Sequence, residues 1–131
     1  MIVQQVGQYA MRLMVVLSLE PERRMRAAEL AERTSISPTY VSKVLRRLTE
    51  AELLDAQKGH AGGFVLAYPP EQITVQDILR AVGIDFTDDA CAFGWEQCSD
   101  RKPCPLHPLW SQLKGSVMDW ANGNTLADAR E

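Results

Sequence analysis

The stretch AAELAERTSISPTYVSKVLRRLTEAELL, from Ala27 to Leu54, decides the fold, because it reads as two helices joined by a tight turn. Alanine and leucine at helical spacing give its first part a small apolar face, and TSIS then interrupts the pattern. Ser37 followed by Pro38 is a typical helix start, with an N-cap side chain and proline at the first helical position. The sequence therefore predicts a second helix from Pro38 to about Ala51.

This second helix has one apolar and one polar face. Its apolar stripe predicts a buried side formed by Tyr40, Val41, Val44, Leu45 and Leu48. The polar side offers hydrogen-bond donors of short and long reach, which suits a helix that enters the major groove of DNA. An ordinary amphipathic helix with solvated lysines and arginines would show the same pattern. The candidate DNA-binding residues of the helix are Ser37, Thr39, Tyr40, Ser42, Lys43, Arg46 and Arg47.

A glycine-rich hairpin is predicted directly after this helix. LLDAQ and GFVLAYPP are short strand candidates, and KGHAGG between them contains three glycines that permit a turn. Lys58 and His60 would place further DNA-binding donors at the tip of the hairpin. Helix, turn, helix and hairpin in this order predict a winged helix-turn-helix, which is a mostly α fold with a small β-hairpin wing.

Further helices are expected on both sides of this unit. One runs from Val6 to Glu20, and a second opens at TVQDILRAV, where Thr74 and Asp77 form a capping box. A long C-terminal helix is expected from about Pro105 or Pro108 to Asn122, and its apolar side would pair with a symmetric second copy of the chain. The candidate dimer-interface residues are Leu109, Trp110, Leu113, Val117 and Trp120.

Composition and charge exclude several classes of protein. The 131 residues predict one domain, and the longest apolar run, LMVVLSL, is too short to span a bilayer. No positively charged leader is visible, so a cytoplasmic protein is expected. The net charge is −3, but residues 1–60 carry a net +2 and residues 61–131 a net −5, which leaves the basic residues where DNA would bind. No nucleophile–base pair, phosphate loop or carboxylate pair is present, so we do not expect an enzyme.

All three cysteines lie in one segment, CAFGWEQCSDRKPCPLHPLW, from Cys91 to Trp110. Six residues separate Cys91 from Cys98 and five separate Cys98 from Cys104, and His107 follows closely. This spacing lacks the paired C-x-x-C knuckles of structural zinc modules and the vicinal pair of a thioredoxin-like couple. Three thiolates and an imidazole suit an iron–sulfur cluster. Reversible oxidation of the thiols, without metal, remains an alternative.

The chain resembles the winged-helix regulators typified by IscR and NsrR. The resemblance rests on the helix-turn-helix stretch, on a wing pattern G-x-x-G-G-aromatic-x-L that begins at Gly59, and on the segment C-x-L-H-x-L-W that begins at Cys104. It implies that the three cysteines bind a 2Fe–2S or 4Fe–4S cluster. IscR-like members use the histidine that matches His107 as the fourth ligand. NsrR-like members use an acidic residue early in the first helix, where this chain has Gln8.

These observations predict a homodimeric DNA-binding repressor whose affinity for a pseudo-palindromic operator depends on an iron–sulfur cluster that senses nitric oxide, redox state or iron. The metal ligands would be Cys91, Cys98, Cys104 and His107, with a 2Fe–2S cluster favoured over 4Fe–4S. Residues 1–83 would bind DNA, residues 84–107 the cluster, and residues 108–131 would form the dimerisation helix and tail of one compact domain. The alternatives are a cluster-free thiol sensor of the same fold and a metal-binding module that pairs with protein.

Overall fold

A central helix, α1 (Gln5–Leu19), organises the fold in the computed structural model, which describes residues 4–84 and 107–129. α1 packs against α2 (Ala27–Thr34), α3 (Pro38–Glu50) and α4 (Val75–Ala81). Its inner side chains, Leu13, Met14 and Leu17, are fully or almost fully buried. The helix predicted from Val6 to Glu20 is therefore confirmed, and its apolar side forms the centre of the core.

The helix-turn-helix has the predicted start and stop signals. α2 ends at Thr34, its C-cap Ser35 has a left-handed φ of 58°, and α3 starts at Pro38 behind the Ser37 cap. The backbone N–H of Tyr40 donates to Ser37 Oγ at 3.3 Å, which satisfies one of the free donors at the start of α3. The stripe from Val41 to Leu48 faces the core, so the opposite side of α3 is left on the surface.

The wing is a two-stranded antiparallel hairpin of β1 (Leu54–Gln57) and β2 (Gly63–Leu66). Leu54 pairs with Leu66 and Gln57 with Gly63, so the tip consists of residues 58–62. β2 is shorter than GFVLAYPP predicted, because the strand stops at Leu66 and a 3₁₀ turn, η1 (Pro70–Gln72), follows. Two consecutive prolines lack the N–H groups that a continued strand would need.

A short piece of chain before α2 extends the hairpin on its second side. Met25 and Phe64 exchange both backbone hydrogen bonds, at 2.9 and 2.8 Å, in an isolated antiparallel bridge. Met25 itself is fully buried. The wing is therefore attached along its β2 side to the segment that leads into the helix-turn-helix.

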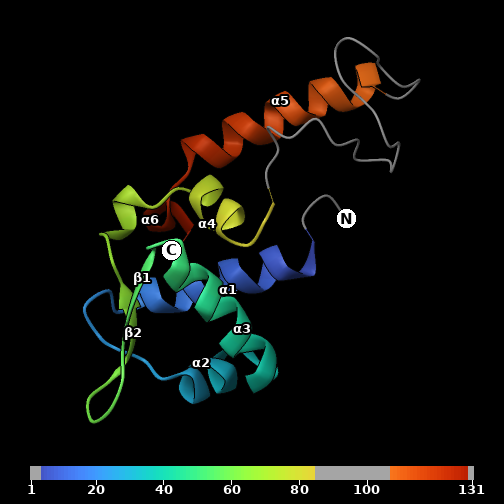
Figure 1. The fold of residues 1–131 in the computed structure, drawn as a ribbon. Helices are drawn as coiled ribbons and strands as arrows, with labels where there is room; N and C mark the ends of the chain where they lie inside the picture. The colour runs from blue at the N-terminus through green and yellow to red at the C-terminus, as the bar shows by residue number, and fades with distance from the viewer. Residues whose placement is uncertain (1–3, 85–106, 130–131) are drawn as a thin grey trace.

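The C-terminal elements are α5 (His107–Gly123) and α6 (Leu126–Ala129). The predicted capping box is present, because Asp77 N–H donates to Thr74 Oγ1 at 3.1 Å and Thr74 N–H donates to Asp77 Oδ2 at 3.0 Å. Thr74 also forms an isolated bridge with Thr125, and buried Leu126 fixes the chain after α5. α5 is thus attached at its C-terminal end, while its N-terminal part extends away from the helix-turn-helix (Figure 1). No helix in the described part of the chain is long and apolar enough to cross a membrane.

Candidate nucleic-acid interface

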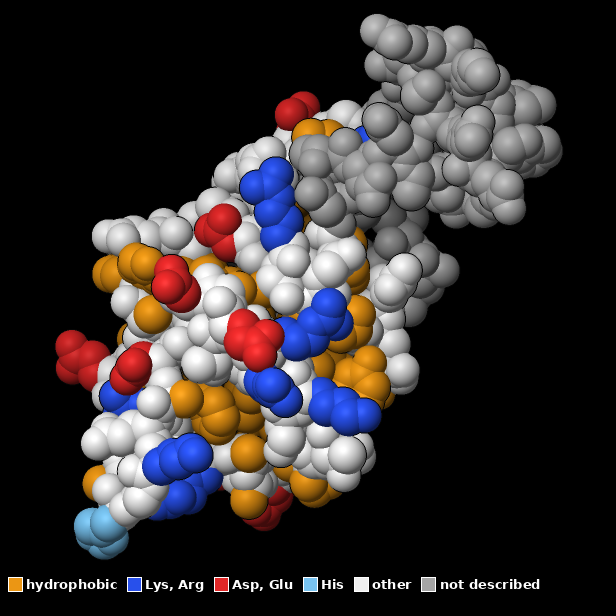
Figure 2. All heavy atoms as spheres, viewed as in Figure 1, with side chains coloured by type: hydrophobic (Ala, Val, Ile, Leu, Met, Phe, Trp, Pro, Cys, Tyr) orange, Lys and Arg blue, Asp and Glu red, His pale blue; other side chains and the backbone are white. Residues whose placement is uncertain are grey.

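The outer side of α3 is the centre of the candidate interface. Its predicted DNA-binding residues are exposed except for Tyr40, which is half-buried. Figure 2 shows lysine and arginine side chains over the part of the surface that α3 and the wing form, with a few acidic side chains among them. The structure therefore brings the residues predicted on α3 onto one accessible surface.

Tyr40 connects the start of α3 to α1. Its ring meets Tyr9 edge to face, with 5.0 Å between the ring centroids and an angle of 89° between the planes. Gln5 Nε2 donates to the Tyr9 hydroxyl at 2.8 Å, and the Arg12 guanidinium lies 5.8 Å from the Tyr9 ring centroid. Aromatic pairs of this geometry are favourable beyond their burial alone. The contact therefore fixes the end of α3 that a major-groove helix directs toward the bases.

The three cations of α3 have different surroundings. Arg46 Nε donates to Glu50 Oε1 at 3.0 Å, but the Arg46 side chain is 81% exposed, so the pair contributes little stability. A Cβ atom at Gly83 would lie 3.0 Å from a guanidinium nitrogen of Arg47, which places Arg47 against the end of α4. Lys43 is exposed and has no ion-pair partner among the described residues. Lys43 and Arg46 are thus the α3 cations most accessible to a phosphate.

The wing carries the two residues predicted at its tip, Lys58 and His60, and both are exposed. The sequence reading missed the segment that supports the wing. Arg24 donates to the Asp55 carboxylate and, at 3.2 Å each, to the carbonyl oxygens of Asp55 and Gly63. One arginine therefore joins both strands of the hairpin. Its partners are more than thirty positions away in the chain, so only an extended strand pattern before α2 could have suggested the contact.

α5 carries the residues of the predicted dimer interface. Leu113 is 42% and Trp120 52% exposed, and Val117 beside them is half-buried against α4. Leu109 and Trp110 belong to the same helix. Since large apolar side chains are usually covered, this exposed stripe is a candidate protein contact.

Only one predicted metal ligand lies within the described residues. Cys91, Cys98 and Cys104 lie outside them, and His107 is the first residue of α5. Within residues 4–84 and 107–129, no group of three or more His, Cys, Asp or Glu side chains could hold a metal ion. The donor set itself, three thiols and an imidazole, fits an iron–sulfur cluster by its chemistry.

Known proteins resemble this chain over almost all of its length. A family model described as "Rrf2: Iron-dependent Transcriptional regulator" matches residues 3–131. An HTH-type transcriptional regulator of Aquifex aeolicus is 30% identical over 98% of this chain and 90% of its own length. The HTH-type transcriptional regulator IscR of Sodalis glossinidius is 31% identical over 93% of this chain and 74% of its own length.

Solved structures share the fold. IscR of T. potens is 26% identical, covers 97% of this chain with 84% of its own, and has a TM-score of 0.76. CymR, the global cysteine regulator of B. subtilis, is 24% identical, covers 98% of this chain with 95% of its own, and has a TM-score of 0.78. These relatives are regulators and not enzymes. The chain belongs to the Rrf2 family and is a DNA-binding transcriptional regulator of the winged-helix type.

Proposed function

We propose that the protein is a homodimeric repressor whose affinity for a pseudo-palindromic operator is controlled by an iron–sulfur cluster. The observation that carries the proposal is that His107, the last of the four candidate ligands, is also the first residue of α5. The ligand set thus leads directly into the helix with the exposed apolar stripe. Ligation at one end of this helix and subunit pairing along it would therefore involve the same element.

Cys91, Cys98, Cys104 and His107 would hold the cluster, with 2Fe–2S favoured over 4Fe–4S. The iron-dependent character of the family supports this assignment. When bound, such a cluster would supply reactivity toward nitric oxide, oxygen or iron shortage. Gln8, which lies on α1 and is half-buried, is a poor ligand for iron, so His107 is the better fourth donor.

The chain's own residues perform the DNA binding in this proposal. Two symmetric subunits present two copies of α3 to successive major grooves, as paired recognition helices do. Ser37, Thr39 and Tyr40 at the start of α3 meet base edges and phosphates, together with Ser42 beside them. Lys43, Arg46 and Arg47 neutralise phosphates, and Lys58 and His60 extend the contact through the wing.

The cluster can control DNA affinity only if the cluster-bound and cluster-free proteins differ in their contacts at the dimer interface. The geometry of α5 supports this proposal. α5 is packed against α4 near Ala121, which is fully buried, while Leu113 and Trp120 stay exposed and would be available to a partner subunit. A change in how His107 is held would alter the position of α5 relative to its partner, and with it the spacing of the two α3 helices.

The test compares iron-loaded and iron-free protein after anaerobic purification. We expect a coloured protein that contains iron and sulfide, and a change of at least about tenfold in DNA affinity when the cluster is removed, which corresponds to a coupling free energy of about 1.4 kcal/mol. Equal affinity of the two forms at matched salt would contradict the switch. A colourless protein without iron and sulfide would favour the thiol sensor.

The two histidines of the chain provide a matched control. His107→Ala is expected to change the visible spectrum or the iron content of the protein, because it removes a proposed ligand. His60→Ala, at the exposed tip of the wing, is expected to leave the spectrum unchanged and to weaken DNA binding. If both substitutions left the spectrum and iron content unchanged, His107 would not be a ligand.

A further inference from the structure

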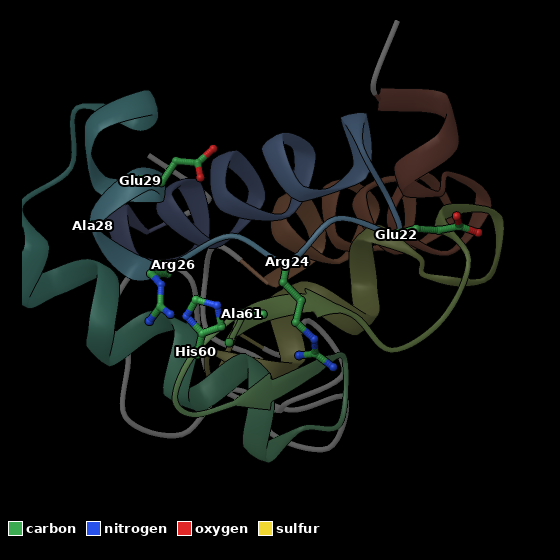
Figure 3. Close-up of a pocket in the computed structure, with 8 residues that line it drawn as sticks. Glu22, Arg24, Arg26, Ala28, Glu29, His60 and Ala61 are labelled. Carbon is green, nitrogen blue, oxygen red and sulfur yellow. The ribbon is translucent and has the colours of Figure 1, made fainter.

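A surface pocket lies between the start of α2 and the tip of the wing (Figure 3). Its volume is about 710 Å³, and it is open toward solvent. The residues that line it come from the segment before α2, from the first turn of α2 and from the wing tip: Glu22, Arg24, Arg26, Ala28, Glu29, His60, Ala61 and Gly62. The pocket therefore joins the two parts of the molecule that flank α3 in the sequence.

Arg26 is held in this pocket by the wing. Its guanidinium donates to the carbonyl oxygen of Gly59 at 2.6 Å. Side chains alternate along extended chain, so buried Met25 faces the core while Arg24 and Arg26 on either side of it face the hairpin. Figure 3 shows the Arg26 and His60 side chains near one another at one end of the pocket. The bond to Gly59 uses only part of the donor capacity of the guanidinium, which has five N–H groups.

The charge of Arg26 is not neutralised by the acidic residues nearby. Among the described residues, no carboxylate forms an ion pair with it. Glu29 is engaged with Arg23 at 2.9 Å and with Arg33 at 3.7 Å, and Arg24 is paired with Asp55. Figure 3 shows the carboxylates of Glu22 and Glu29 directed away from the Arg26 side chain. The Arg26 end of the pocket is therefore positive.

The start of α2 adds to this positive character. Arg26 occupies the N-cap position of this eight-residue helix, and its side chain does not cap the helix. Free N–H groups of a first helical turn favour anions, which here would be in reach of the Arg26 guanidinium as well. Because a guanidinium fork matches the geometry of phosphate oxygens, the chemistry of the site favours a phosphate over other anions.

We propose that Arg26 binds a phosphate of the DNA backbone in this pocket, next to the phosphates that the wing contacts. This inference rests on the proposed operator binding and adds a contact residue outside α3 and the wing. Arg26 then has two functions in one geometry, since it fixes the wing tip through Gly59 and offers its remaining donors to the DNA.

The test uses a duplex selected by the wild-type protein from a randomised pool, and it measures the salt dependence of the binding constant. Each phosphate contact contributes about −0.9 to the slope of log K against log[salt]. Arg26→Gln is therefore expected to make the slope shallower by about 0.9 per bound subunit. Arg26→Lys is expected to keep the slope, because it keeps the charge, while it weakens binding through loss of the fork.

Arg23→Gln is the matched control, since it removes a cation three positions away that is already engaged. The carboxylates of Glu20 and Glu29 raise the pKa of Arg23 through their hydrogen bonds, because its positive charge is already paired with them. We expect its slope to equal that of the wild-type protein. As a second readout, ethylation of one backbone phosphate in each half-site should impair the wild-type protein and have no effect on the Arg26→Gln variant.

An unchanged slope for Arg26→Gln, with weaker binding, would mean that Arg26 only supports the wing and would overturn the inference. The proposed function would still stand in that case. If the wild-type protein retained no duplex from the pool at low salt, operator binding itself would be wrong, and the inference would fail with it.

Discussion

At Gly63 the wing approaches the segment before α2 so closely that no side chain fits. Its φ of 125° lies in the region that favours glycine, and a Cβ atom there would lie 2.8 Å from the carbonyl oxygen of Met25 and 2.9 Å from its carbonyl carbon. Both atoms belong to the backbone, which is already engaged with Phe64. The lack of a side chain at the first residue of β2 thus lets the wing dock on this segment.

Gly63→Ala is expected to lower the free energy of unfolding by at least about 2 kcal/mol, because backbone strain and a clash with fixed backbone atoms add. Gly59→Ala is the control. Gly59 also has a positive φ, of 90°, but nothing lies within 4 Å of its Cβ position, so only the strain of about 1 kcal/mol applies. Urea unfolding followed by circular dichroism measures both values, and equal losses at the two positions would contradict the docking argument.

Local signals in the sequence were sufficient for the positive φ of Gly63 but not for the contact that it makes. A cluster of glycines predicts positive φ angles wherever the cluster lies. The closeness of Met25 depends on chain folding over almost forty positions, and Arg24 and Arg26 resemble solvated surface residues until their partners are known. The same reason explains why the two arginines were missing from the predicted interface.

On the scale of elements, α5 is the described helix that exposes two large apolar side chains. Leu113 and Trp120 are about half exposed, and their spacing of seven positions places them on one side of the helix with Val117. The side of α5 near Ala121 is covered by α4. Val117 and Ala121 therefore pack on α4, while Leu113 and Trp120, at the border of the same apolar side, stay exposed.

Leu113→Lys is expected to dissociate the proposed dimer. Because Leu113 is 42% exposed, the burial lost is about 0.6–1.3 kcal/mol per subunit, and a lysine charge in the interface adds to this loss, so two subunits together lose at least about tenfold in association constant. Gln112→Lys is the matched control, since it places the same charge on the adjacent, exposed position of α5. Size-exclusion chromatography with light scattering distinguishes the two variants. A dimer that persists in Leu113→Lys would show that this side of α5 is not the interface.

The boundaries of elements followed from the sequence where a cap or a proline marks them. Ser37 fixes the start of α3 and Thr74 the start of α4, and both caps are present as hydrogen bonds. β2 was predicted too long, because aromatic and aliphatic residues continue the strand pattern up to Tyr68, whereas the ladder ends at Leu66 with one further hydrogen bond, from the Ala67 N–H to the Leu53 carbonyl oxygen at 3.0 Å. The cysteine segment was recognised only by its residue types, and residues 85–106 lie outside the described part of the chain.

On the scale of the whole molecule, the charge is distributed unevenly along the chain, and the candidate DNA-binding residues lie in its more basic part. Residues 1–60 contain nine lysines and arginines against seven acidic residues, whereas residues 61–131 contain five against ten. The first range includes α3, α2 and most of the wing, and the second includes α4 and α5. A chain with a net charge of −3 can therefore still present a locally basic surface to a polyanion.

This distribution of charge predicts that the affinity of the proposed dimer for DNA falls steeply with salt concentration, to an extent set by the number of phosphate contacts. If Lys43, Arg46 and Arg47 of both subunits neutralise about six phosphates, log K falls against log[salt] with a slope near −5, and Arg26 would steepen it to about −7. Fluorescence anisotropy with a labelled duplex between about 50 and 200 mM salt should then show at least about a thousandfold loss of affinity. Lys43→Gln is expected to make the slope shallower by about 0.9 per subunit, while Lys114→Gln, a lysine on α5, should not change it. A wild-type slope between zero and about −2 would mean that two phosphates or fewer are contacted, and binding would then depend on base and shape contacts at the start of α3 instead of on this charged surface.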